Sequence, residues 1–380
     1  MTTSVSTVPF FKHDLGQAEL DSISDVFKTP ILTTGDFVTT FERRFEELVD
    51  LKHALGVTSC TGAMHMSLVA LGIGPGDEVI TTPLTFIATS TAILEAGATP
   101  VFVDVEPDTG NLDASKIEAA ITPRTRAIIP VHLYGQMCDM QAIAKIAKKH
   151  GLHVIEDAAH CVEGERDGIR PGQASATACY SFYATKNLTC GEGGAVATND
   201  SDLARELKLL RTHGMDKTAN DRSKEGYKHW DMVRLGWKYN MDNIHAAILL
   251  PQIDRFDENW KKRAALAEYY FERLSQIPGV KFPVAKPGVR HAHHLFTIWI
   301  EPPHSRDKVI HALQQRGIGV MVNYRAIHLL TYFQELLNHQ PGHLPNAESI
   351  GDKTISIPFY PSMPLEHVDI VARALKEALC

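Results

Sequence analysis

A lysine that follows a buried-looking apolar run is the clearest candidate for covalent chemistry in the sequence. Lys186 comes shortly after the run at 180–182 and stands among small and aromatic residues. Such surroundings remove water from an amine, depress its pKa and favour Schiff-base formation with an aldehyde. A solvated surface lysine is the plainer alternative, but it is less natural so close to an apolar run.

Two carboxylates and an imidazole follow another apolar run. Residues 154–155 lead into Glu156 and Asp157, and His160 comes three residues later. In an open α/β sheet, functional groups gather at the carboxyl ends of the strands, so Asp157 and His160 are candidate site residues. The alternative is that Asp157 only caps the turn or helix that follows.

Two stretches of small residues could hold a phosphate or approach a ligand closely. Residues 59–65 run from a strand into a helix, whose first N–H groups suit an anion, although an ordinary Ser/Thr helix cap explains such a stretch more often. Residues 190–194 contain three glycines soon after Lys186. Glycines permit positive φ or close backbone approach, but by themselves they indicate only a turn.

Several other chemistries are disfavoured. The sequence has no P-loop, and residues 72–76 lack the glycine spacing of a dinucleotide fingerprint. The histidines at 291, 293 and 294 have no carboxylate or cysteine cluster nearby, so we expect no metal. The net charge of −7 gives no basic footprint, so we expect no nucleic-acid partner.

The elements that position these residues are predicted by alternating apolar runs and helical patterns. Expected helices lie at 63–71, 115–120 and 140–150, the last ended by Gly151. The pattern predicts βαβ units and a mostly parallel, seven-stranded sheet covered on both faces. Its strands are expected at 54–57, 79–81, 100–103, 127–131, 154–156, 179–182 and 195–198.

Length and pattern predict a second, smaller domain. A chain of 380 residues exceeds what one core usually serves. Long helices are expected at 202–211 and 242–276, followed by strand-like runs at 294–300 and 319–322 and a helix at 368–379. We therefore expect a large domain at 1–250 and a small α+β domain at 251–380.

Composition bears on the compartment. Hydrophobic residues make up 44% and charged residues 22%, which excludes a disordered chain. The six cysteines form no CxxC pair, which suits reduced thiols. Neither a signal peptide nor a membrane span is recognisable, so we expect a cytoplasmic protein without a membrane partner.

The combination of a phosphate cradle, a strand-end aspartate and a lysine resembles a known family. Over nearly its whole length the chain resembles the sugar aminotransferases of the DegT/DnrJ/EryC1/StrS family, with the closest look to 4-amino-4-deoxy-L-arabinose-type members. The resemblance implies the fold type I α/β architecture and pyridoxal 5'-phosphate as cofactor. The stretches that carry it are 33–35, 59–65, 74–80, 156–160, 181–194, 236–241 and 323–328.

The resemblance also implies roles for individual residues. Lys186 would form the Schiff base and move the proton, and an ionised Asp157 would pair with the pyridine nitrogen. His160 would lie near the ring hydroxyl, and Phe86, where close relatives carry Trp, would stack on the ring. The residues implied as phosphate ligands are Thr61, Gly62 and Ser181.

Further contacts are implied across a homodimer and toward the substrate. Asn240 would reach the phosphate of the neighbouring subunit, and Lys238 is the alternative for that contact. The residues expected to face the substrate are Thr33, Arg325 and His328, although a polar strand end explains the last two as well.

These expectations predict a transaminase with two half-reactions. L-glutamate would supply the amino group, and the keto carbon of a nucleotide-linked sugar, at C4, would receive it. A 3-keto sugar and a cofactor-binding regulator without turnover are the alternatives. A nicotinamide oxidoreductase is disfavoured because the fingerprint is missing.

Overall fold

A seven-stranded sheet forms the centre of the large part of the molecule. The computed structural model describes residues 7–216 and 229–379. The strand order is β1-β8-β7-β5-β4-β2-β3, and all neighbours are parallel except β8, which is antiparallel to both β1 and β7. The strands are β1 (His53–Val57), β2 (Glu78–Thr81), β3 (Thr99–Phe102), β4 (Thr125–Ile129), β5 (His153–Asp157), β7 (Thr177–Ser181) and β8 (Gly194–Thr198). This confirms the predicted α/β sheet.

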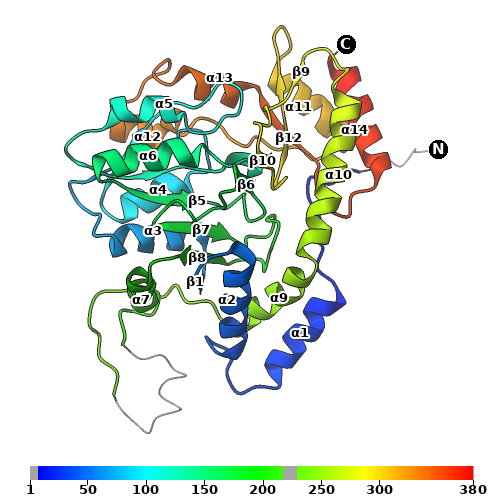
Figure 1. The fold of residues 1–380 in the computed structure, drawn as a ribbon. Helices are drawn as coiled ribbons and strands as arrows, with labels where there is room; N and C mark the ends of the chain where they lie inside the picture. The colour runs from blue at the N-terminus through cyan, green and yellow to red at the C-terminus, as the bar shows by residue number, and fades with distance from the viewer. Residues whose placement is uncertain (1–6, 217–228, 380) are drawn as a thin grey trace.

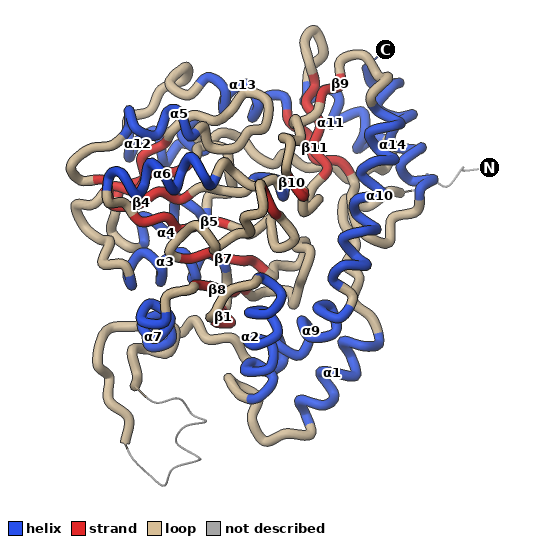
Figure 2. Tube along the Cα trace, in the orientation of Figure 1, coloured by secondary structure: helices blue, strands red, loops and turns tan. Residues whose placement is uncertain are grey.

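Helices cover both faces of this sheet, as Figure 2 shows. Side chains alternate between the faces, so Cys179 packs in the core with α3 (Cys60–Ala70), while its neighbour Tyr180 packs against α2 (Asp36–Val49). The first face also carries α4 (Ala88–Glu95) and α7 (Ser201–Leu210). The second carries α6 (Met140–His150) and α9 (Asn243–Asp254).

The predicted end of α6 is confirmed. Asp139 caps its start by accepting the N–H of Ala142, and Gly151 follows its end at φ 65°, a conformation that favours glycine. Short elements complete the large part: α1 (Gln17–Phe27), α5 (Ala114–Ile117), η1 (Glu118–Ala120), η2 (Leu133–Gly135) and β6 (Glu165–Arg166), which pairs with β10 (Val289–Arg290).

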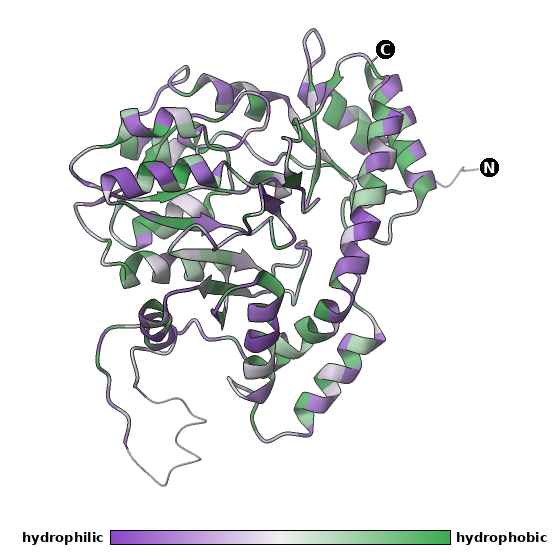
Figure 3. Cartoon of the chain, in the orientation of Figure 1, coloured by the Kyte–Doolittle hydropathy of each residue, from purple (hydrophilic) through white to green (hydrophobic). Residues whose placement is uncertain are grey.

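A second, antiparallel sheet lies at the other end of α10 (Phe256–Leu274), at the upper right of Figure 1. Its order is β12-β11-β9, with β9 (Val280–Lys281), β11 (Phe296–Ile300) and β12 (Thr354–Ile357). Together with α10, α11 (Arg306–Gln315) and α14 (Leu365–Leu379) it encloses its own core, which we call the small-domain core. Hydrophilic and hydrophobic residues alternate along α10 and α14, as expected for helices packed on one side (Figure 3).

The chain between α11 and β12 forms η3 (Ile327–Leu329), α12 (Thr331–Leu337) and α13 (Pro345–Lys353), whose buried residues share a core with Phe102 of β3 and Trp299 of β11. Two predicted elements differ from the structure. The helix expected at 242–276 is divided into α9 and α10, because Arg255 leaves helical geometry and its guanidinium pairs with Glu19 of α1. The run at 319–322 is no strand, and only Met321 forms a bridge, to Ser356.

The N-terminal segment bridges both parts. Val8 pairs with Ile318 and is fully buried in the small-domain core, whereas α1 packs on α9. The boundary at 250/251 stays a prediction. In the part of the chain that the structure describes, no helix is both long and apolar enough to cross a bilayer.

Candidate active site

Adjacent parallel strands bring the predicted chemistry together. Asp157 ends β5 and Ser181 ends the neighbouring β7, and α3 begins beside them at Cys60. The Cys60 Sγ lies 3.9 Å from Asp157 Oδ1. Lys186 lies close enough to Asp157 for the carboxylate to favour the charged amine.

Burial dominates the electrostatics of Lys186. Removal of water lowers the pKa of this amine to about 8, although the Asp157 carboxylate acts in the opposite direction. At pH 7.4 roughly one amine in five is therefore neutral. Lys186 is thus suited to attack an aldehyde and to exchange a proton.

Hydrogen bonds hold the Asp157 carboxylate in a fixed orientation. Oδ1 accepts the backbone N–H of Ala159 at 3.1 Å, and Oδ2 accepts the hydroxyl of Thr89 at 2.8 Å. The side chain is 5% exposed. These donors fix both oxygens of a carboxylate that is largely shielded from water.

His160 is buried next to this group as a neutral imidazole. Burial lowers its pKa well below the ordinary value, and the positive charge of Lys186 lowers it further. Nδ1 accepts the N–H of Tyr134, so the ring proton is assigned to Nε2, which donates to the Tyr324 hydroxyl at 3.2 Å. The ring of His294 lies 4.4 Å from that of His160, centre to centre.

Glu156, the second carboxylate of the motif, has a structural role. It is fully buried, and its Oε2 accepts a hydrogen bond from His132 Nε2 at 2.6 Å. Its Oε1 accepts the N–H of Gly172 at 2.8 Å. Both carboxylate oxygens are therefore satisfied inside the fold, away from the group around Lys186.

The first turn of α3, residues 60–62, is the predicted phosphate cradle, and its backbone N–H groups have no acceptor within the helix. Ser59 caps the helix by accepting the N–H of Gly62 at 3.0 Å, and Thr61 is half-buried beside it. Strand β8 approaches this turn so closely that a Cβ on Gly194 would lie 2.5 Å from Ser59 C and 2.6 Å from Cys60 N. The close approach expected of the glycine-rich stretch thus occurs at Gly194.

Segment 323–328 lies against the large part of the molecule at this place. The Tyr134 hydroxyl donates to the Asn323 carbonyl at 2.5 Å, and the Tyr324 ring centre lies 6.1 Å from that of Phe86. Phe86 is 57% exposed. Arg325 is exposed and makes no hydrogen bond or ion pair with the described residues.

Other predicted residues lie elsewhere. His328 is fully buried and its Nε2 contacts Glu348 at 3.0 Å, so it does not face an open site. Thr33 is exposed and precedes Thr34, whose hydroxyl accepts the Asn240 amide at 2.7 Å. The Lys238 ammonium donates to Asn240 Oδ1 at 2.6 Å, so the two alternatives for the cross-subunit contact are hydrogen-bonded together.

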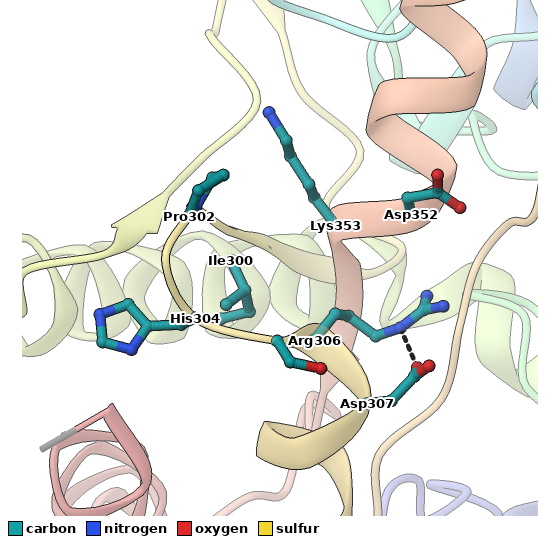
Figure 4. Close-up of a pocket in the computed structure, with 8 residues that line it drawn as sticks. Ile300, Pro302, His304, Arg306, Asp307, Asp352 and Lys353 are labelled. Carbon is teal, nitrogen blue, oxygen red and sulfur yellow. Dashed lines mark hydrogen bonds and ion pairs between the residues drawn. The ribbon is translucent and has the colours of Figure 1, made fainter.

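A cavity of about 360 Å³ lies away from this group, beside the start of α11 (Figure 4). It contains none of the predicted site residues, and the guanidinium of Arg306 in its wall is already paired with Asp307. We therefore assign it no part in the site.

Two contacts of the site were not predicted from the sequence. Thr89 contacts Asp157 from 68 residues away, and Tyr324 contacts His160 from 164 residues away. Thr89 stands in the first turn of α4, three residues after Phe86, and this proximity to a predicted site residue is the sequence signal that could have pointed to it.

The residues present fit pyridoxal phosphate. The cradle at α3 suits its phosphate, and a buried carboxylate suits its protonated ring nitrogen. The depressed pKa of Lys186 suits its aldehyde.

Comparison with known proteins agrees with this fit. The model of the DegT/DnrJ/EryC1/StrS aminotransferase family matches residues 13–376. The chain is 40% identical over 375 residues to the spore coat polysaccharide biosynthesis protein SpsC of Bacillus subtilis (strain 168), covering 97% of this chain and 96% of SpsC. The chain belongs to the DegT/DnrJ/EryC1/StrS aminotransferase family.

Solved structures of this family have the same fold. DesV of S. venezuelae, in complex with a ketimine intermediate, is 36% identical with a TM-score of 0.90, covering 98% of both chains. Spr1654 of Streptococcus pneumoniae, in its PLP-form, is 27% identical with a TM-score of 0.90, again covering 98% of both chains. The protein is therefore a sugar aminotransferase of fold type I that uses pyridoxal phosphate. When bound, this cofactor accepts the electrons left by removal of a proton from the substrate carbon.

Proposed function

We propose that the protein transfers the amino group of L-glutamate to the C4 keto carbon of a nucleotide-linked keto-deoxysugar. The observation that carries the proposal is the convergence of Lys186, Asp157 and His160 at neighbouring strand ends, bordered by Tyr324. This arrangement supplies the Lys186 amine, whose pKa of about 8 lies close to physiological pH, and the Asp157 carboxylate in a fixed orientation.

The chain's own residues have distinct tasks in this proposal. Lys186 binds the cofactor covalently and carries the proton to and from the substrate carbon, which its pKa of about 8 permits in both directions. Asp157 holds the positive charge of the ring nitrogen. Phe86 offers an aromatic face to the ring, and Thr61, Gly62 and Ser181 hold the phosphate.

Arg325 is proposed to bind the diphosphate of the substrate. Its guanidinium is exposed beside Tyr324, and it has no acidic partner among the described residues. Guanidinium groups bind phosphate oxygens in a planar, two-point geometry. SpsC is named for polysaccharide biosynthesis, and this supports an activated sugar as the amino acceptor.

We further infer a cytoplasmic homodimer. The chain around 229–236 exposes Met232, Val233 and Leu235 at 52%, 54% and 68%. Neighbouring exposed apolar side chains of this kind support an interface. Lys238 and Asn240, which follow this segment directly, are proposed to reach the partner's cofactor phosphate.

The test begins with the visible spectrum of the purified protein with pyridoxal phosphate. L-glutamate should bleach the band, and borohydride should label Lys186 in the unbleached protein, as read by peptide mass. The amine-form protein is then mixed with 4-keto and 3-keto sugars linked to UDP, dTDP or GDP. Recovery of the band with a 4-keto sugar supports the proposal, recovery only with 3-keto sugars assigns C3, and no recovery with any of them contradicts it.

A further inference from the structure

A buried hydroxyl on α4 makes the shortest hydrogen bond that the Asp157 carboxylate has with the described residues. Thr89 is fully buried, and its Oγ1 lies 2.8 Å from Asp157 Oδ2. Among the described residues the carboxylate has two other donors, the Ala159 N–H at 3.1 Å and the Cys60 thiol at 3.9 Å, and both contact Oδ1. Oδ2 therefore depends on Thr89 for its orientation.

The direction of the Thr89 hydroxyl follows from its neighbours. An alternative acceptor is the Phe86 carbonyl, but its oxygen is uncharged and lies farther from Thr89 Oγ1, at 3.4 Å. The Thr85 hydroxyl, also buried, lies 3.2 Å from Thr89 Oγ1 and can donate to it. The Thr85 hydroxyl can thus donate to the Thr89 hydroxyl, which donates to the carboxylate, and the two hydrogen bonds strengthen each other.

We propose that Thr89 is a positioning residue for amino transfer, which fixes the Asp157 carboxylate in the orientation that faces the cofactor ring. The inference rests on the proposed function, because it requires Asp157 to pair with the cofactor ring nitrogen. Thr89 also belongs to the first turn of α4, which begins two residues after Phe86, so one short segment carries both the hydroxyl that contacts the carboxylate and the proposed ring-stacking residue. Nothing in this role requires Thr89 to touch the cofactor.

The neighbouring residue offers a matched control. Ser90 is equally buried in α4, but its Oγ has no hydrogen-bond partner among the described residues. Removing its hydroxyl perturbs the same helix without touching Asp157. Ser90→Ala and Thr89→Val therefore differ in the one contact that the inference concerns.

The experiment compares wild type, Thr89→Val, Thr89→Ser and Ser90→Ala. For each we measure the Kd of pyridoxal phosphate for the cofactor-free protein, the position of the visible band, the Tm, and kcat and KM for the half-reaction with L-glutamate. We expect Thr89→Val to lose about tenfold in kcat, the order expected for a hydrogen bond to a charged group, with KM little changed. Its cofactor Kd should rise several-fold, while Thr89→Ser and Ser90→Ala stay close to wild type.

Three results would overturn the inference: wild-type kcat and Kd in Thr89→Val, an equal loss in Ser90→Ala, or failure of Thr89→Ser to restore function. If Thr89→Val does not fold, Thr89→Ala replaces it, and the Thr89→Ser comparison still decides. Failure of the proposed function is a separate result, since wild type itself would then show no bleaching with L-glutamate.

Discussion

At the scale of single residues, burial gives Lys186 a reactivity that its sequence neighbours alone do not. An ordinary lysine with pKa 10.5 has roughly one neutral amine in 300 at pH 8, whereas a pKa of about 8 makes about half of them neutral. The pKa is lowered, so the reactive neutral form appears as pH rises through about 8 rather than through 10.5.

We therefore expect the rate at which cofactor-free protein captures pyridoxal phosphate to rise with pH, with its midpoint near 8. The initial rate of visible-band formation across roughly pH 6 to 10 measures it. Lys148→Arg, on the exposed side of α6, should keep the profile, and Lys186→Arg should form no band. A midpoint at 10 or above would show that burial does not control this amine.

The two adjacent carboxylates should separate stability from catalysis. Glu156→Gln removes a charge that accepts hydrogen bonds from His132 and Gly172. We therefore expect the free energy of unfolding to fall by about 2 kcal/mol, seen as unfolding at lower urea concentration, with little loss of activity in the folded protein. Asp157→Asn should keep its stability and lose about 100-fold in kcat. Urea titrations and glutamate half-reaction rates on both variants check this, and equal activity losses would refute the assignment.

At the scale of elements, the meeting of β8 with the start of α3 leaves no space for a side chain. A Cβ at Gly194 would press on the Ser59 and Cys60 backbone, so Gly194→Ala must displace the phosphate cradle. We expect a loss of about 3 kcal/mol in unfolding free energy and about tenfold weaker cofactor binding. Gly74→Ala, whose Cβ would find its nearest atom at 3.5 Å, is the control, and an equally small effect at Gly194 would contradict the geometry.

The same elements show what could be predicted from sequence. Strands β5 and β7 were found because uninterrupted apolar runs mark strands covered on both faces, and the residues at their ends then suggested a site. The division of the helix at Arg255 was missed because the helical pattern continues across it, whereas only the folded chain brings Glu19, 236 residues away, to the Arg255 guanidinium. Thr89 and Tyr324 were missed for the same reason, since only the folded chain brings them to Asp157 and His160.

Segment 323–328 should matter for the second substrate more than for the first. Tyr324→Phe removes the partner of His160 Nε2 beside the exposed Arg325, so we expect about a tenfold loss of kcat/KM for the nucleotide sugar and less for L-glutamate. Comparing the two half-reactions measures this. Equal losses in both would place Tyr324 in the common chemistry instead.

At the scale of the whole molecule, the proposed homodimer implies that each active site needs residues from both subunits. The hydrogen bonds of Lys238 and Asn240 lie within their own chain, and their proposed task is in the partner's site. Leu235→Asp should therefore yield inactive monomers by sedimentation, because it places a charge among exposed apolar side chains. Leu365→Asp, on a separate exposed leucine of α14, should stay dimeric and active.

Mixed dimers test whether the sites are shared. Lys186→Ala and the double variant Lys238→Ala/Asn240→Ala should each be inactive as homodimers. When the two are coexpressed, about half of the dimers are mixed, and in each of these one site combines an intact Lys186 with an intact Lys238 and Asn240 from the partner. Activity should then recover to about a quarter of wild type. If Lys238 and Asn240 serve their own subunit's cofactor, no site in the mixture is complete and no activity returns.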